Sequence, residues 1–132
     1  ALEDAGVEYD RSLILNDPES YTSMFTARFQ PQDFLSRRYT AICSHTSLAI
    51  VAVSQWLYRN NLRIFDDVSI IGYGDYPYLP TLNVPFTTIA VPSLEMGRSA
   101  VDEISEALLN RRPLQSVGHE VWLEKRNTVR TL

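Results

Sequence analysis

The sequence contains one cysteine, Cys43, and it has no stretch of about 18 uninterrupted apolar residues. A single thiol excludes an internal disulfide framework, and it fits a reducing compartment such as the cytoplasm. The lack of a long apolar run excludes a membrane-spanning helix, so no membrane partner is expected. Residues 1–4 lack both a starting Met and the basic start of a secretory signal, so we expect a fragment of a longer cytoplasmic protein.

The chain also lacks an excess of positive charge. Its 12 lysines and arginines are outnumbered by 16 aspartates and glutamates, which gives a net charge of −4. That sign is wrong for a surface that meets nucleic-acid phosphates, so any contact with DNA is expected to belong to another part of the protein. The length of 132 residues, of which 45% are hydrophobic, is typical of one globular domain.

Apolar runs typical of strands alternate along the chain with patterns typical of helices. This alternation predicts an α/β fold, with a parallel sheet flanked by helices on both faces. Within the sheet, Cys43 is expected to be a small buried side chain. The expected strands are residues 13–15, 39–43, 68–73, 87–91 and 117–125, and the expected helices are 19–30, 32–38, 47–60 and 93–110.

The helix expected over residues 47–60 is apolar on more than one side. A helix on the surface of a domain normally shows a single apolar stripe. This helix is therefore predicted to be buried on two sides, by its own sheet and by a partner. Its large apolar side chains are Leu48, Ile50, Val51, Val53, Trp56, Leu57 and Tyr58.

Polar and aromatic residues follow three of the expected strands, where ligands of open parallel sheets bind. Ser44 and Thr46 either bind a ligand or cap the helix that follows them. Asp75 either binds two hydroxyls of a sugar or accepts hydrogen bonds from the backbone amides of a turn. Tyr76 and Tyr78 either stack on the apolar face of a sugar or pack within their own loop. The three segments are residues 44–47, 72–78 and 90–93.

The sequence gives little support for catalysis, for a metal site or for a bound cofactor. Ser44 or Ser47 beside His45 raises the hypothesis of a hydrolase, but no G-x-S-x-G turn surrounds either serine. A polar loop histidine is the favoured interpretation, and no enzyme activity is predicted. The only other histidine is His119, and no H-x-x-x-H spacing or cysteine pair exists, so no metal is expected. Gly72-Tyr73-Gly74 lacks the third glycine of a nucleotide loop, and no cofactor is expected.

Four blocks of the sequence, in the same order and with matching gaps, resemble the LacI/GalR transcriptional regulators. Residues 40–49 resemble their TAIFAANDLMA stretch, and residues 62–73 resemble their segment lrvPeDvsvvGfDd. Residues 85–100 are similar to PpLTTirqP followed by MGrrA, and residues 120–128 to the closing strand eLvvRxST. Residues 1–10 also fit the family, so the resemblance covers nearly the whole chain.

The resemblance implies a type I periplasmic-binding-protein-like sensor of two α/β subdomains, with a small effector such as a sugar in the cleft between them. Such sensors form homodimers and bind operator DNA through an N-terminal headpiece. Residues 1–132 would be the C-terminal portion, without the headpiece and the first subdomain. The helix over residues 93–110 would pack on that other subdomain, leaving its apolar face uncovered here. A periplasmic solute-binding protein of the same fold is the alternative.

The resemblance also implies which residues contact the effector, and the sequence departs from the family pattern at three of these places. Thr46-Ser47 replaces an Asn-Asp pair, Gly74 replaces the first of two aspartates, and Val91 replaces a glutamine. Because a carboxylate and two amides that grip sugar hydroxyls are lost, we expect an unusual effector or none. The implied contact residues are Thr46, Ser47, Gly74, Asp75, Val91 and Asp17.

Dimer contacts in the family come from the helix before the second strand and from the loop before Thr-Thr-Ile. The two-sided apolar helix is explained if one of its sides meets a second copy of the chain. The alternative is that Trp56 and Tyr58 are ordinary amphipathic cover. The implied interface residues are Val51, Gln55, Trp56, Tyr58, Thr81, Leu82, Asn83 and Val84.

Overall fold

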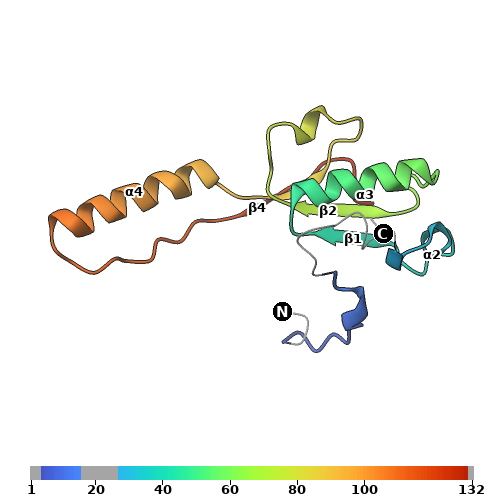
Figure 1. Ribbon diagram of the computed structural model, residues 1–132, viewed down its shortest axis with the longest axis horizontal. Helices are drawn as coiled ribbons and strands as arrows, with labels where there is room; N and C mark the ends of the chain where they lie inside the picture. Colours follow the sequence, from blue (N-terminus) through green and yellow to red (C-terminus); the bar gives the residue numbers. More distant parts are fainter. Residues whose placement is uncertain (1–3, 16–26, 131–132) are drawn as a thin grey trace.

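A computed structural model describes residues 4–15 and 27–130 and shows a four-stranded sheet in the order β1-β2-β3-β4 (Figure 1). β1 (Ala41–Ser44), β2 (Ser69–Tyr73) and β3 (Thr87–Ala90) are parallel to their neighbours. β4 (Trp122–Glu124) pairs antiparallel with β3. The α/β class is therefore confirmed, but the wholly parallel sheet is wrong at β4, because the chain leaves the carboxyl end of β3 along α4 and comes back to that same end.

The helices agree with the sequence patterns, apart from the first segment. α2 (Pro31–Leu35), α3 (Ser47–Arg59) and α4 (Ser93–Leu109) fall within or close to the expected ranges. The strand expected over residues 13–15 is wrong: Leu13 belongs to a 3-10 turn, η1 (Arg11–Leu13), and residues 14–15 pair with no described strand. In that turn the Asp10 carboxylate accepts from Ser12 N at 2.8 Å. Of the helix expected over residues 19–30, residues 19–26 lie outside the described part of the chain.

α3 covers one face of the sheet and supplies the centre of the core (Figure 1). Its Ile50, Val53 and Leu57 are buried and belong to the same hydrophobic cluster as Ile70 of β2. Gly72 lies beneath Ile50, because a side-chain carbon added at Gly72 would lie 1.8 Å from Cδ1 of Ile50. The absence of a side chain on Gly72 thus allows α3 to approach the sheet closely.

The opposite face of the sheet carries exposed side chains. Successive residues of a strand point to opposite faces, and the register places Cys43 on the face away from Ile70 and Gly72. Cys43 is exposed, so the expectation of a buried thiol is wrong. Tyr73, on the same side, is also exposed. Among the described helices, α3 makes the main contacts with the sheet, so the expected helical cover on both faces is not observed in this part of the chain.

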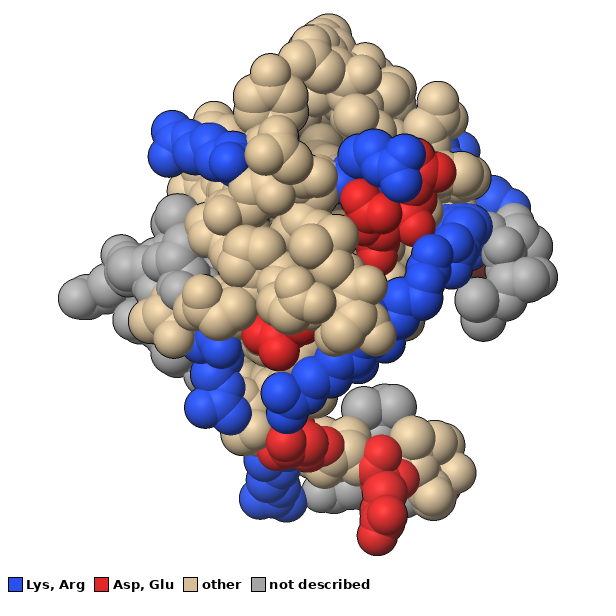
Figure 2. Space-filling view, turned by 90° about the vertical axis from the view of Figure 1, so that its right-hand side faces the viewer, with Lys and Arg blue, Asp and Glu red and all other residues tan. Residues whose placement is uncertain are grey.

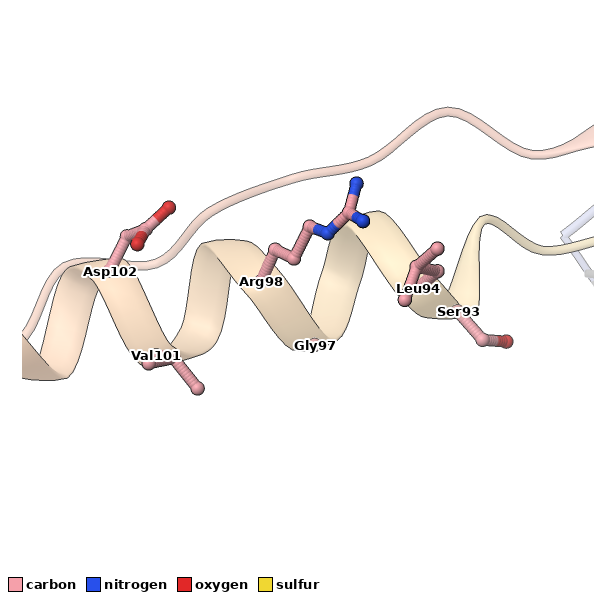
Figure 3. A pocket seen from close by; sticks show the side chains of 6 residues that line it. All are labelled: Ser93, Leu94, Gly97, Arg98, Val101 and Asp102. Carbon is pink, nitrogen blue, oxygen red and sulfur yellow. The ribbon is translucent and has the colours of Figure 1, made fainter.

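α4 leaves the sheet after β3 and projects away from it (Figure 1). Leu94, Val101 and Leu108 recur every seven residues, share one side of the helix, and are all exposed. Figure 3 shows Leu94 and Val101 beside a shallow hollow at the start of α4, which is also lined by Ser93, Gly97, Arg98 and Asp102. The expectation that this helix presents an uncovered apolar face is confirmed.

The segment after α4 is held against that helix by ionic contacts. Arg112 donates to both carboxylate oxygens of Glu103, at 2.6 and 2.8 Å, and to Glu106 at 3.1 Å. Gln115 N donates to Glu103 at 2.6 Å. The hydrogen bonds from Arg112 and then Gln115 lower the pKa of Glu103 to about 2. These contacts anchor the start of the return segment to α4, which projects from the root formed by β3 and β4.

Thr128 ties the end of the chain to the amino ends of β2 and β3. Its hydroxyl donates to Ile70 O at 2.7 Å and accepts from Thr87 N at 2.8 Å, and its side chain is fully buried. These two bonds satisfy backbone groups inside the core.

None of the described helices is both long and apolar enough to cross a membrane.

Replacing Gly72 by Ala is expected to lower the free energy of unfolding by about 1–3 kcal/mol, because the new methyl group must displace Ile50 within a packed core. Urea unfolding followed by tryptophan fluorescence measures this change. In the background of Ile50→Val, which removes the clashing Cδ1, the cost of Gly72→Ala should be smaller. Gly97→Ala is the matched control, because α4 has open space there and Ala is the better helix former. Equal costs at both glycines would contradict the close approach.

Candidate functional site

The carboxyl ends of β1, β2 and β3 lie along one edge of the sheet, because the three strands are parallel neighbours. We call this the strand-tip edge and define it as residues 44–47, 74–78 and 90–93. The Ser47 hydroxyl donates to Gly74 O at 2.8 Å and to Tyr73 O at 3.3 Å. Gly74 N donates to Ile89 O at 2.9 Å. These bonds hold the three segments together, as the sequence predicted.

The hydroxyl groups at the start of α3 form hydrogen bonds with backbone groups of the chain. Thr46 is the N-cap, and its Oγ1 accepts from Ala49 N at 3.2 Å. Ser44 Oγ donates to Thr46 O at 2.9 Å. Ser47 is buried, and both of its hydrogen bonds run to backbone carbonyls. The capping interpretation is thus confirmed for Thr46, whose own hydroxyl proton remains available for donation. The Ser47 hydroxyl donates to carbonyls rather than to an imidazole, which removes its role as an activated nucleophile.

Asp75 forms an ion pair that neither of its sequence-based interpretations included. Its two carboxylate oxygens each accept from the Arg126 guanidinium at 2.7 Å, and Thr88 Oγ1 donates to it at 2.9 Å. The two charged side chains are 24% and 15% exposed, so water screens the pair only in part. The hydrogen bonds from Arg126, and then from Thr88, lower the pKa of Asp75 against the opposing effect of burial. Each of the two oxygens therefore accepts at least one intramolecular hydrogen bond.

Arg126 is the residue of this region that the sequence reasoning missed. Besides Asp75, its guanidinium donates to Phe86 O at 2.8 Å, and its backbone N donates to Thr87 Oγ1 at 3.0 Å. Asp75 raises the pKa of Arg126 through a direct hydrogen bond, which keeps the pair ionised. The arginine of the closing motif over residues 120–128 was the available indication, but nothing in its spacing pointed to a partner 51 residues away.

Two tyrosines occupy the loop that follows β2. The rings of Tyr76 and Tyr78 stack with centroids 5.8 Å apart and planes inclined by 20°. Gly74 has a φ of +86°, a conformation that favours glycine, and a side-chain carbon added there would lie 3.1 Å from Cε2 of Tyr76. The ring of Tyr76 therefore lies where a side chain at position 74 would begin.

Two further residues, Val91 and Asp17, are implied effector contacts. Val91 is partly buried at the root of α4, where its carbonyl accepts from Ser93 N at 2.8 Å. Asp17 lies outside the described residues. Of the six implied contact residues, Thr46, Ser47, Gly74, Asp75 and Val91 are thus brought to the strand-tip edge.

The implied dimer contacts fall into two groups. Leu48, Val51, Gln55 and Tyr58 follow each other at helical spacing and define what we call the outer face of α3. Val51 is partly buried and also packs against the hydrophobic core. Tyr58 is 83% exposed and Leu48, which the sequence reasoning did not include, is also exposed. Trp56 instead points toward α2, with its ring 6.2 Å from that of Phe34. In the loop residues 81–84, Leu82 packs against the core, while Thr81 and Asn83 are exposed.

One end of the molecule carries side chains of both charges. At the end of the molecule shown in Figure 2, Lys and Arg side chains lie among Asp and Glu side chains. Among the ion pairs of the described residues, Arg63 is 3.2 Å from Asp66 and 3.3 Å from Asp67. No group of three or more metal-binding side chains occurs among residues 4–15 and 27–130.

The sequence is similar to those of known proteins of one family. A family model described as the periplasmic binding protein-like domain matches residues 1–129. Over 111 residues the chain is 24% identical to the transcriptional repressor PurR of Photobacterium profundum, which covers 84% of the chain and 33% of the repressor. Over 96 residues it is 29% identical to the arabinose metabolism transcriptional repressor of Geobacillus stearothermophilus, which covers 69% of the chain and 26% of that protein.

Solved structures match the fold over the whole chain. The crystal structure of a LacI family transcriptional regulator from Enterococcus faecium with bound ribose superposes with a TM-score of 0.80 at 20% identity, covering 100% of this chain and 49% of that one. The transcription regulator CcpA of Lactococcus lactis gives a TM-score of 0.77 at 17% identity. The chain thus spans a third or less of the two curated relatives and about half of the solved chain.

Removing the charge of Asp75 is expected to destabilise the chain in a pH-dependent way. The pKa of Asp75 is below its ordinary value of 3.8 in the folded state, so the ion pair stabilises the fold above that pH and is lost as the pH falls through the lowered pKa. Asp75→Asn should therefore lower the free energy of unfolding by about 1–3 kcal/mol at pH 7 and by much less near pH 2.

Urea unfolding of both proteins across this pH range measures the difference. Asp66→Asn is the control, since Asp66 forms an exposed pair with Arg63 and should cost less than about 1 kcal/mol at any pH. A cost for Asp75→Asn that is the same at pH 7 and near pH 2 would show that the carboxylate is not held by Arg126.

Proposed function

Because the chain belongs to the periplasmic binding protein-like domain family of the LacI-type transcriptional regulators, we propose that it is the effector-sensing and dimerisation part of such a regulator. The matched curated relatives are transcriptional repressors, which agrees with the prediction that the chain is not an enzyme. On this proposal residues 1–132 form the C-terminal portion of the effector domain, and the protein acts in the cytoplasm on operator DNA through a separate headpiece.

The observation that carries the proposal is the position of the strand-tip edge beside the root of α4. Ser47, Gly74 and Ile89 join the three strand ends by hydrogen bonds, and α4 begins directly after the third. The uncovered apolar face of α4 suits the first subdomain, which would close a cleft over that edge. A small molecule bound in the cleft would contact both subdomains and would favour one of their arrangements. It would thereby shift the affinity for the operator.

A periplasmic solute-binding protein of the same fold is the second candidate. Solved regulators related in fold have been crystallised with ribose, glucose and sucrose, so a binding site for small polar molecules is compatible with both functions. The two candidates differ in the rest of the gene. A helix-turn-helix upstream of this chain identifies the regulator, and a secretory signal identifies the solute-binding protein.

An effector of the full-length protein is expected to raise its Tm, because a ligand that binds only the native state stabilises it. At about 100 times its Kd, such a ligand contributes about 2.7 kcal/mol. Differential scanning with a panel of sugars, nucleosides and phosphate esters measures the shift, and operator binding with the same compounds reports the response. Complete indifference to the whole panel in both measurements would contradict effector sensing.

The outer face of α3 is expected to join two copies of the full-length protein. Tyr58→Glu places a charge at a highly exposed position of that face and should convert the dimer to a monomer in sedimentation analysis. Leu35→Glu on α2, also an exposed apolar residue, is the control and should leave the dimer intact. A wild-type protein that is monomeric at high concentration would contradict the proposed interface.

A further inference from the structure

The carboxylate of Asp75 keeps one acceptor position that its partners in the chain do not fill. Oδ1 accepts two hydrogen bonds, from Arg126 Nη1 at 2.7 Å and from Thr88 Oγ1 at 2.9 Å. Oδ2 accepts one, from Arg126 Nη2 at 2.7 Å. Each oxygen of an ionised carboxylate has two lone pairs, so Oδ2 can accept one further hydrogen bond. The Asp75 side chain is 24% exposed, so part of it can be reached from outside the fold.

The hydroxyl of Thr88 is directed at this carboxylate from inside the sheet. Thr88 belongs to β3, is fully buried, and places its Cγ2 3.6 Å from the point where a side chain at Gly72 would begin. Thr87 and Thr128 are also buried, but their hydroxyls bond to backbone groups. The Thr88 hydroxyl instead donates to Asp75. Because a valine has nearly the same shape, the hydroxyl of Thr88 serves to hold Asp75 rather than to fill space.

The guanidinium of Arg126 holds Asp75 from a second direction. Its Nη1 also donates to Phe86 O at 2.8 Å, and the backbone N of Arg126 donates to Thr87 Oγ1 at 3.0 Å. A planar guanidinium that is anchored in this way presents Nη1 and Nη2 to the two carboxylate oxygens in a fixed geometry. Turning the carboxylate away would break the bonds from both Arg126 and Thr88, so Asp75 is held in one orientation.

From these contacts we propose that Thr88 and Arg126 are positioning residues of the effector site, which hold Asp75 so that its Oδ2 accepts one hydrogen bond from the effector. This inference rests on the proposed function. The donor is a hydroxyl or an N–H group of the effector. An acceptor that is already oriented loses little conformational freedom when the ligand binds, which favours affinity.

The same contacts keep the acceptor charged. The hydrogen bonds from Arg126, and then from Thr88, lower the pKa of Asp75, so the carboxylate is ionised at neutral and mildly acidic pH. Hydrogen bonds to an ionised group are stronger than those between neutral groups. Thr88 therefore contributes both to the orientation and to the charge of Asp75, although it is not expected to touch the effector.

The test uses the full-length protein with ribose, glucose, sucrose and adenosine as probes. Thermal scanning identifies the probes that raise the Tm, and calorimetric titration then gives their affinities. We expect Asp75→Asn to weaken binding by about tenfold or more, and Thr88→Val, which removes one supporting hydrogen bond, by about threefold to tenfold. Thr88→Ser retains the hydroxyl and should remain within about twofold of the wild type.

The pH dependence of binding distinguishes positioning of the charge from a general loss of stability. Removing the Thr88 hydroxyl raises the pKa of Asp75 toward its ordinary value, because one of the bonds that lower it is lost. As the pH is lowered from neutral, the affinity of Thr88→Val should therefore begin to fall at a higher pH than that of the wild type. Thr88→Ser should follow the wild type.

Ser54→Ala is the matched control. The Ser54 hydroxyl donates to Val51 O at 2.8 Å within α3, so this variant also loses one partly buried hydroxyl hydrogen bond, but away from the strand-tip edge. It should bind the probe with the affinity and the pH profile of the wild type. A drop in affinity equal to that of Thr88→Val would show that lost stability, and not the position of Asp75, weakens binding.

The outcomes separate this inference from the proposed function. A probe that raises the Tm and changes operator affinity, but binds equally to the wild type, Asp75→Asn and Thr88→Val, overturns the positioning role and leaves effector sensing in place. An affinity that falls in Asp75→Asn but not in Thr88→Val overturns the role of Thr88. Indifference of Tm and operator affinity to every probe overturns both the inference and the proposed function.

Discussion

The ion pair between Asp75 and Arg126 joins the loop after β2 to the chain that has returned from α4. It is held by two charge-assisted hydrogen bonds of 2.7 Å and supported by Thr88. Arg126 also grips Phe86 O, so one guanidinium fixes the strand-tip edge relative to β3 and β4. The geometry of the candidate site therefore depends on a residue that follows the whole α4 excursion.

This arrangement connects the site to α4, whose apolar face is not covered by any of the described residues. β3 leads out to α4 and β4 leads back, and the two strands pair at its root. Arg112 and Glu103 hold the start of the return segment to α4.

The positions of the site residues could be predicted from the local sequence, but their hydrogen-bond partners could not. Polar residues after apolar runs correctly placed Thr46, Ser47 and Asp75 at one edge, because parallel strands align their carboxyl ends. The sequence does not predict which of these side chains can bind a ligand, since that depends on the hydrogen bonds each one already makes within the fold. Ser47 carries a hydroxyl in the sequence, but in the fold that hydroxyl is buried and donates to Gly74 O.

Periodicity and turn residues in the sequence were enough to determine α3, α4 and three of the strands, because these features act over a few residues. The tertiary structure alone decided the direction of β4, the exposure of Cys43 and the partner of Asp75. Each of these depends on the path of the chain through space. The direction of β4 follows from how the segment after α4 returns to the sheet, and the exposure of Cys43 follows from which face α3 covers. The pairing of Asp75 follows from a contact across 51 residues.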